Sequence, residues 1–235
     1  MTEALIQGLL LGGFYAILAA GLSLMFGVMR IINLAHGDLA IVGAFGVIAL
    51  TERFGISPWL ALLLVLPVMA LIGIALQRWL FARTLRAGIL LPLLVTFGLG
   101  AVLQNTLYGV FGSEARSLGS ALGDLAWASW ELPGGIIVGQ LPVITFVIAV
   151  AVLGALQLLL SHTALGRAIR AAASDPEAAA LCGVDARRVH RAAAAIAVAL
   201  AGLAGAALAM QATVEPYGGP TLLIQAFEAV VIGGI

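Results

Sequence analysis

Long runs without a single charged side chain constrain this sequence most. Five of them cover residues 5–28, 55–77, 87–113, 140–160 and 192–214, and two shorter apolar runs cover 39–51 and 221–235. A helix that crosses a bilayer needs about 20 predominantly apolar residues. The sequence therefore predicts an all-α fold, a polytopic transmembrane helical bundle of about seven apolar segments that forms one domain over residues 1–235.

The composition excludes several other classes of protein. Hydrophobic residues make up 63% of the chain and charged residues only 9%, whereas about a quarter of the residues in soluble domains are charged. Eleven arginines balance eleven acids, so a broad basic face for nucleic acid is not expected. There is no lysine for a P-loop, and the lone Cys182 allows neither an internal disulfide nor a cysteine-based metal site. Residues 1–10 lack the basic region of a cleaved signal peptide and are interpreted as the start of the first span.

Small residues recur at every fourth position in two of the runs. They are Gly8, Gly12, Ala16 and Ala20 in the first run, and Ala201, Gly205 and Ala209 in the run 192–214. Such a row lets a neighbouring helix approach closely, although a chain rich in Ala and Gly also produces it by chance. We expect the first row to be a helix-packing face, and the second row has the same pattern.

A polar segment follows the first run and contains Asn33, His36 and Asp38. Either a helix begins near Leu34 and carries His36 and Asp38 in its first turns, or the segment is a broken helix. Broken helices in transporters often carry functional polar groups, so Asn33, His36 and Asp38 are candidates for a translocation path or a hinge. The alternative is interfacial capping, with Asn33 as the helix cap and Asp38 facing water.

Two amides, Gln104 and Asn105, lie in the run 87–113. They are candidates either for lining a path or for hydrogen bonding to a neighbouring helix, and the second role is the more common one. Glu228 is the one carboxylate well inside an apolar run. A self-contained secondary transporter would need more ionisable groups there, and an intramembrane enzyme would need a catalytic cluster, so both classes are disfavoured.

Arginine placement predicts the orientation in the membrane. Alternating spans put one group of arginines on the same side: Arg30, Arg78, Arg83, Arg86, Arg167, Arg170, Arg187, Arg188 and Arg191. Only Arg53 and Arg116 fall on the other side. The positive-inside rule makes the first side cytoplasmic. The N-terminus is then outside, together with a polar loop over 114–131, whose Trp127 and Trp130 are interpreted as interfacial anchors, and a turn at 133–135.

The longest polar stretch is 161–191, and it contains five of the arginines. A helix is expected over 164–173, followed by a second short helix in which Pro176 takes the first position and Glu177 the first turn. This helix continues through Ala178, Ala179, Ala180 and Leu181 and stops at Gly183. It is too short to be stable alone in water, so it either docks against a partner or is a plain solvated connector.

Three segments together carry a family resemblance. IINLAHGD at 31–38, TFGL at 96–99 with Gln104 and Asn105, and TALGRAIR at 163–170 resemble the permease subunits of bacterial branched-chain amino acid ABC importers, the LivH-like group. Glu177, Ala178, Ala179 and Gly183 resemble the coupling motif of ABC-importer permeases. The resemblance implies that these four residues contact an ATPase and that 161–191 is a cytoplasmic coupling loop.

The resemblance also implies a function, a location and a set of partners. The expected protein is a multi-pass permease of the bacterial inner membrane that carries leucine, isoleucine and valine, with urea, short amides or other amino acids as alternative substrates. Its expected partners are a second, LivM-like permease, two cytoplasmic ATP-binding subunits, a periplasmic amino-acid-binding protein and the lipid bilayer. It is not expected to be an enzyme or to hold a cofactor or metal. Family members continue past 230–234, so either the sequence is incomplete or the last helices are missing.

Overall fold

The computed structural model describes residues 1–84, 88, 90–132 and 136–233. Arg86, the turn expected at 133–135 and Ile235 therefore lie outside the described residues. The helices are α1 Thr2–Met29, α2 His36–Phe54, α3 Pro58–Leu76, the π-helical turn η1 Gln77–Phe81, α4 Ala82–Thr84, α5 Leu90–Phe111, α6 Gly119–Leu122, the 3-10 turn η3 Gly123–Ala126, α7 Gln140–His162, α8 Ala164–Ser174, α9 Pro176–Leu181, α10 Ala186–Gln211 and α11 Gly219–Gly233. The strands are β1 Ser129–Leu132 and β2 Ile136–Gly139.

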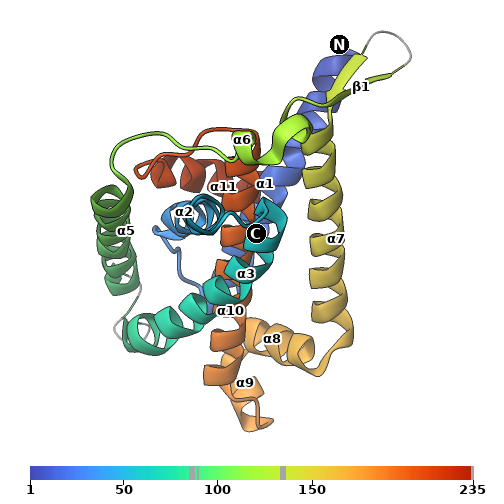
Figure 1. The fold of residues 1–235 in the computed structure, drawn as a ribbon. Coiled ribbons are helices and arrows are strands. Elements are labelled where there is room, and N and C mark those ends of the chain that lie inside the picture. Colours follow the sequence, from blue (N-terminus) through green and yellow to red (C-terminus); the bar gives the residue numbers. More distant parts are fainter. Residues whose placement is uncertain (85–87, 89, 133–135, 234–235) are drawn as a thin grey trace.

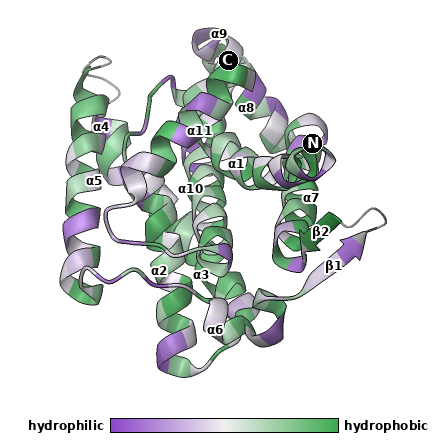
Figure 2. Ribbon diagram, turned by 90° about the horizontal axis from the view of Figure 1, so that it is seen from above, coloured by the Kyte–Doolittle hydropathy of each residue, from purple (hydrophilic) through white to green (hydrophobic). Residues whose placement is uncertain are grey.

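The helices follow the apolar runs of the sequence. Five helical stretches in the described part of the chain are long and apolar enough to cross a membrane: α1, the stretch Pro58–Thr84, α5, α7 and α10. The two shorter runs form α2 and α11. Figure 2 shows that hydrophobic residues dominate the long helices. The expected all-α, multi-pass architecture is therefore confirmed.

The structure differs from the sequence-based expectation in two segments, the helix expected over 192–214 and the polar loop over 114–131. The helix expected over 192–214 runs instead from Ala186 to Gln211, because the carboxylate of Asp185 accepts a hydrogen bond from the Arg187 N–H at 2.9 Å and caps it earlier. The polar loop continues into an antiparallel hairpin, in which Ser129 of β1 pairs with Gly139 of β2. The β-branched residues of β2 favour this extended pairing. The all-α bundle thus carries one small two-stranded addition.

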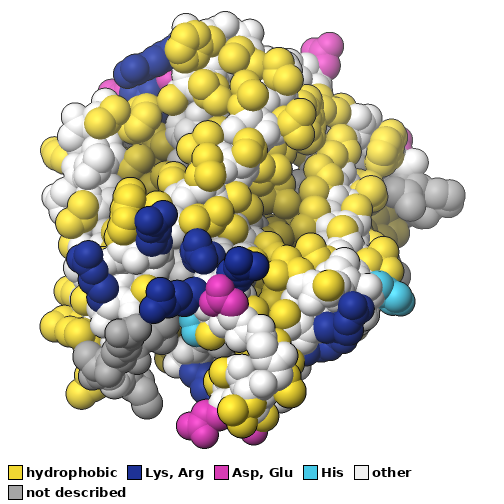
Figure 3. Space-filling model, turned by 90° about the horizontal axis from the view of Figure 1, so that it is seen from below, with side chains coloured by type: hydrophobic (Ala, Val, Ile, Leu, Met, Phe, Trp, Pro, Cys, Tyr) yellow, Lys and Arg dark blue, Asp and Glu magenta, His cyan; other side chains and the backbone are white. Residues whose placement is uncertain are grey.

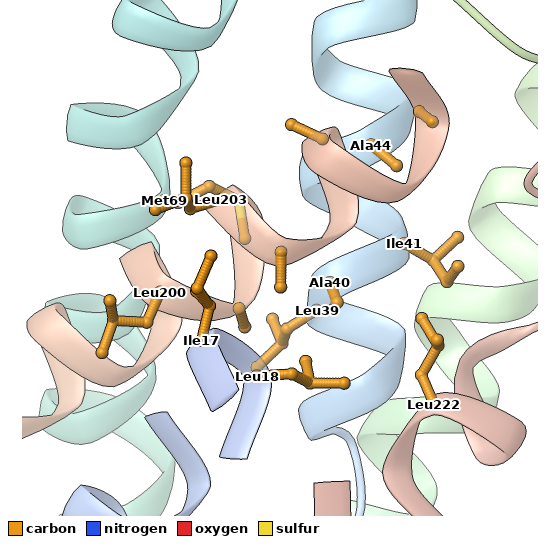
Figure 4. Packing of buried hydrophobic residues seen from close by; sticks show 14 of the residues in the cluster. Ile17, Leu18, Leu39, Ala40, Ile41, Ala44, Met69, Leu200, Leu203 and Leu222 are labelled. Carbon is orange, nitrogen blue, oxygen red and sulfur yellow. The ribbon is translucent and has the colours of Figure 1, made fainter. Parts of the chain in front are cut away.

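Helix α10 lies at the centre of the molecule and packs against α1, α2 and α3. Helix α2 crosses it steeply (Figures 1 and 4). The crossing is close because Gly43 faces Gly202 and Gly205 faces the backbone of Ala40, with no room for a Cβ atom at these contacts. Figure 4 shows the apolar residues that surround the crossing, which are Ile17, Leu18, Leu39, Ala40, Ile41, Ala44, Met69, Leu200, Leu203 and Leu222.

The two small-residue rows have different outcomes. Ala201, Gly205 and Ala209 are all buried, so this row is a packing face. The expectation for the first row is wrong at Gly8 and Gly12, which are exposed and where a Cβ atom would have no neighbouring atom within 4 Å, whereas Ala20 is partly buried and packs against the core. Helix α1 uses a different face, on which Gly13 contacts Phe146 of α7 and Gly21 contacts Ala197 of α10. On this face Gly13 and Gly21 are eight positions apart with Ile17 between them, so the four-residue row did not mark the packed face.

The polar elements gather at two opposite ends of the helices. The N-terminus, the hairpin and α6 lie at one end, and α8, α9 and the start of α10 lie at the other (Figure 1). At the α8/α9 end, Arg78 and Arg83 line the same cavity as Arg187 and Arg191, and Figure 3 shows arginine side chains gathered on this face. This grouping of arginines is the one that alternating spans predict.

Candidate functional site

The polar segment between α1 and α2 is a sharp break in the chain. Arg30 ends α1 in the left-handed conformation, with φ 53°, and its N–H donates to the carbonyl of Phe26 at 2.7 Å. Helix α2 begins at His36, so it carries His36 and Asp38 in its first turn. The N-cap position is taken by Ala35, and the buried Asn33 side chain accepts from the Ala35 N–H at 3.1 Å. Asn33 therefore orders the break and is not the cap that interfacial capping requires.

Asp38 is buried among helices and does not face water, which corrects the capping interpretation. Its side chain is only 3% exposed, and its carboxylate accepts a hydrogen bond of 2.8 Å from the Gln104 amide of α5. Gly100 of α5 and Gly219 at the start of α11 both leave room for this carboxylate, because a Cβ atom at either position would collide with it. Asp38 is thus a carboxylate buried inside the apolar bundle, whereas Glu228 lies exposed on α11.

His36 joins α2 to α1. Its ring is fully buried, and its Nε2 lies 3.1 Å from the carbonyl oxygen of Leu18. A carbonyl only accepts, so Nε2 carries a proton and donates this hydrogen bond. Nδ1 has no hydrogen-bond partner among the described residues. Gly21 permits the close approach, since a Cβ atom there would lie 3.0 Å from Cε1 of His36.

Thr96 of α5 belongs to the same cluster. Its hydroxyl accepts from the Leu34 N–H at 3.2 Å and donates to the carbonyl of Leu93 at 3.0 Å. Thr96 was part of a recognised motif but not a candidate site residue. The signal that would have found it is spacing, because Thr96, Gly100 and Gln104 repeat every four positions and share one helix face.

Asn105 does not join this cluster. It lies on the exposed side of α5, and its amide donates to the carbonyl of Ala101 on its own helix at 2.7 Å. Of the two neighbouring amides, only Gln104 bridges to another helix. The cluster of Asn33, His36, Asp38, Thr96 and Gln104 therefore connects α1, α2 and α5 and touches α11.

The buried polar cluster suits one of two roles: it holds the helices together, or it forms part of a translocation path. The described residues contain no group of three or more His, Cys, Asp or Glu side chains arranged to hold a metal ion. Hydrogen bonds between apolar helices hold such helices together in a bilayer. A buried carboxylate of this kind also commonly marks a functional position in a membrane protein.

The short helix α9 is the second candidate site, and its position is set by local capping. Thr163 caps α8 by accepting from the Gly166 N–H at 3.0 Å. Asp175 caps α9 by accepting from the N–H groups of Glu177 and Ala178, both at 3.0 Å. Pro176 takes the first helical position, as expected. These caps let a six-residue helix form at the end of the molecule (Figure 1).

The residues assigned to coupling differ in accessibility. Glu177 and Ala178 are exposed, but Ala179 is 5% exposed and packs inward. Gly183 has a φ of 83° and no neighbouring atom within 4 Å of a Cβ position, so the backbone conformation is what requires glycine there. Leu181, which was not a candidate, is 91% exposed. Its signal in the sequence is that it is the one large apolar residue in an alanine-rich helix.

Apolar helices of membrane-spanning length, with polar groups buried between them, define a multi-pass membrane protein. The model of the family described as branched-chain amino acid transport system / permease component matches residues 4–235. The chain therefore belongs to this family of transport permeases.

Several characterised proteins are similar over almost the whole chain. The high-affinity branched-chain amino acid transport system permease protein BraD of Pseudomonas aeruginosa is 30% identical over 99% of this chain and 79% of its own length. The corresponding LivH protein of Salmonella typhimurium has the same identity and the same coverage. The fructose import permease protein FrcC of Rhizobium meliloti is 31% identical over 93% of this chain and 57% of its own length. No solved structure shows significant similarity.

Proposed function

We propose that this chain is the membrane-spanning permease subunit of an ABC importer in the bacterial inner membrane. It would move leucine, isoleucine and valine into the cell, and separate ATPase subunits would supply the energy. The observation that carries this proposal is α9, a capped helix that presents Glu177, Ala178 and the almost fully exposed Leu181 at one end of the bundle. A short helix with an exposed apolar side chain of this kind suits a cleft in a partner protein.

The chain offers a direct mechanical route from α9 into the bundle. The N–H of Val184 donates to the carbonyl of Ala179 at 3.0 Å, and Asp185 then caps α10. Movement of α9 would therefore be passed to α10, which packs against α1, α2 and α3. Nucleotide binding can drive such a change only if the ATPases bind one arrangement of the permease better than the other.

The proposed complex contains four kinds of partner. They are a second, LivM-like permease, two cytoplasmic ATP-binding subunits, a periplasmic amino-acid-binding protein and the lipid bilayer. Helices α5 and α7 lie at the periphery (Figure 1) and expose large apolar side chains such as Phe97, Val147 and Leu158. Lipid or the second permease would cover these faces.

A cavity at the end opposite α9 supports an aliphatic amino acid as the substrate. It has a volume of about 450 Å³ and lies between α1, α10 and α11. Its lining includes the apolar Leu11, Phe14 and Leu222 and the polar Gln211 and Glu215. Apolar walls suit a branched side chain, and the few polar groups suit the ammonium and carboxylate groups.

Fructose is the second candidate substrate, because a fructose import permease is among the similar proteins. Uptake of labelled leucine by the assembled importer distinguishes the two. We expect excess isoleucine and valine to compete strongly and excess fructose or urea to have no effect. Competition by fructose alone would show that the substrate is a sugar and not an amino acid.

The docking role of α9 is tested by Leu181→Asp, with co-purification of the ATPase subunit as the measurement. Trp127→Asp is the matched control, because Trp127 is 87% exposed and lies between α6 and β1, which are at the opposite end of the molecule. We expect Leu181→Asp to abolish association and the control to retain it. Full association of the Leu181 variant would remove α9 as the docking element.

The energy source and orientation need their own measurements. Uptake into proteoliposomes should stop when the ATPase is omitted or inhibited with vanadate, and undiminished uptake would favour a secondary transporter.

The orientation is tested with an impermeant thiol reagent. Native Cys182 is exposed and should react only in permeabilised cells, whereas a Ser120→Cys variant lacking Cys182 should react in intact cells. The reverse pattern would invert the topology.

A further inference from the structure

A basic cavity of about 880 Å³ lies where the stretch Pro58–Thr84 reaches the α8/α9 end of the molecule. One wall is formed by η1 and α4 and includes Arg78 and Arg83. The other wall is the first part of α10 and includes Arg187 and Arg191. The cavity therefore lies beside the coupling segment and is not part of the polar cluster around Asp38.

The four arginines leave the cavity strongly positive. No acidic residue lines it among the residues that the structure describes. The ion pairs among the described residues are Arg116 with Glu52 and Arg188 with Asp185, and neither involves a lining arginine. Arg191 donates from Nε to the carbonyl of Arg187 at 3.1 Å, which fixes part of its side chain. Guanidinium groups that line one cavity without carboxylates offer several donors to an anion with several oxygens, and phosphate is the common case.

A buried amide at the same site also lacks a partner. Gln77 lines the cavity and is only 3% exposed, yet its side-chain oxygen has no hydrogen-bond partner in the described part of the chain. An unpaired buried polar atom is costly, and in native proteins it usually has a functional reason. The oxygen and nitrogen of an amide can exchange places by rotation, which would put the NH₂ group where the unpartnered oxygen lies. Gln77 opens the π-helical turn η1, a type of irregularity frequent at functional sites.

The position of the cavity indicates where its ligand comes from. Trp79 lies in the same turn and is 66% exposed. An exposed Trp at the end of an apolar span is typical of the membrane–water interface. Basic pockets between membrane helices at such a level suit the headgroups of anionic lipids. We propose that this cavity binds a phosphate group, supplied by the headgroup of an anionic lipid.

The test uses the full-length permease in nanodiscs and measures bound lipid by native mass spectrometry. Phosphatidylglycerol is titrated against a background of phosphatidylcholine. The test variant is the pair Arg78→Gln and Arg187→Gln. The matched control is the pair Arg170→Gln and Arg188→Gln, which removes the same charge outside the cavity lining. Each arginine near an anionic membrane contributes about a fivefold gain in affinity, so the test pair should weaken binding by about 25-fold.

The outcomes separate the possible sources of the ligand. A large loss in the test pair with an unchanged control supports the cavity, and so does a further loss in Gln77→Glu, which adds a carboxylate to it. Displacement of the lipid by excess inorganic phosphate supports phosphate recognition and identifies solution as a second source. Equal losses of lipid binding in the test pair and the control pair would show that binding depends only on the overall surface charge, and would overturn the proposal. Protection of the cavity arginines from arginine-modifying reagents by the ATPase subunit, but not by phosphatidylglycerol, would also overturn it.

Discussion

The amide of Gln104 on α5 donates a hydrogen bond of 2.8 Å to the buried carboxylate of Asp38 on α2. This contact and the hydroxyl of Thr96 tie the peripheral helix α5 (Figure 1) to α2 and to the break before it. Apolar contacts of Leu107 and Phe111 with the core add to these polar ones. In a bilayer the polar contacts are effective because lipid supplies no competing hydrogen bonds.

The first prediction concerns this contact. Gln104→Leu should destabilise the permease by about 1–3 kcal/mol, because it leaves the buried Asp38 carboxylate without its donor. Thermal unfolding in detergent, followed by size-exclusion chromatography, measures the effect. Asn105→Leu is the control, since Asn105 is exposed and bonds only to its own helix. Equal effects of the two variants would contradict a role for the bridge between α5 and α2.

The second prediction concerns the crossing of α10 and α2. Gly205→Ala should destabilise the fold by about 1–3 kcal/mol, because the added methyl group overlaps the backbone of Ala40 and forces the helices apart. Gly12→Ala on α1 is the matched control, because nothing lies within 4 Å of its Cβ position. The same thermal assay should show no loss for the control. A harmless Gly205→Ala would mean that the two helices are not this close.

The third prediction concerns the capping of α9. Asp175→Ala removes the acceptor for the N–H groups of Glu177 and Ala178, which should cost about 1 kcal/mol of helix stability. Amide hydrogen exchange over 177–181 should become faster, and association with the ATPase subunit should weaken. Asp175→Asn keeps a capping oxygen and should restore both properties. Unchanged exchange in the Ala variant would show that α9 does not depend on this cap.

The fourth prediction separates two roles of Gly183. Its φ of 83° should make Gly183→Ala cost about 1–2 kcal/mol in the loop before α10, whatever partner is present. No atom lies near its Cβ position in the isolated chain, so Gly183→Trp should cost a similar amount of permease stability. If the ATPase covers this residue, only the Trp variant will lose association completely. Equal association of the Ala and Trp variants would place Gly183 outside the contact.

The sequence by itself determined the architecture and the polar end of the molecule. Charge-free runs of this length have no stable alternative to membrane helices, because their backbone groups must be paired internally. The capping of α9 was equally local, since Asp175 and Pro176 act within one helical turn. The small-residue row at Gly205 was found by its spacing. The same spacing at Gly8 and Gly12 was misleading, because nothing packs against these two glycines, and the close contacts of α1 are made at Gly13 and Gly21.

The tertiary structure decided which way the polar side chains face. Asp38 was compatible with water at a helix end, and it became buried because α5 and α11 bring Gln104 and Gly219 against it. Gln104 and Asn105 are neighbours in the sequence, yet helical geometry turns one inward and one outward. Arg78 and Arg187 form one cavity only after α3 and α10 pack together. These contacts join residues far apart in the chain, and local patterns contain no information about which helices will meet.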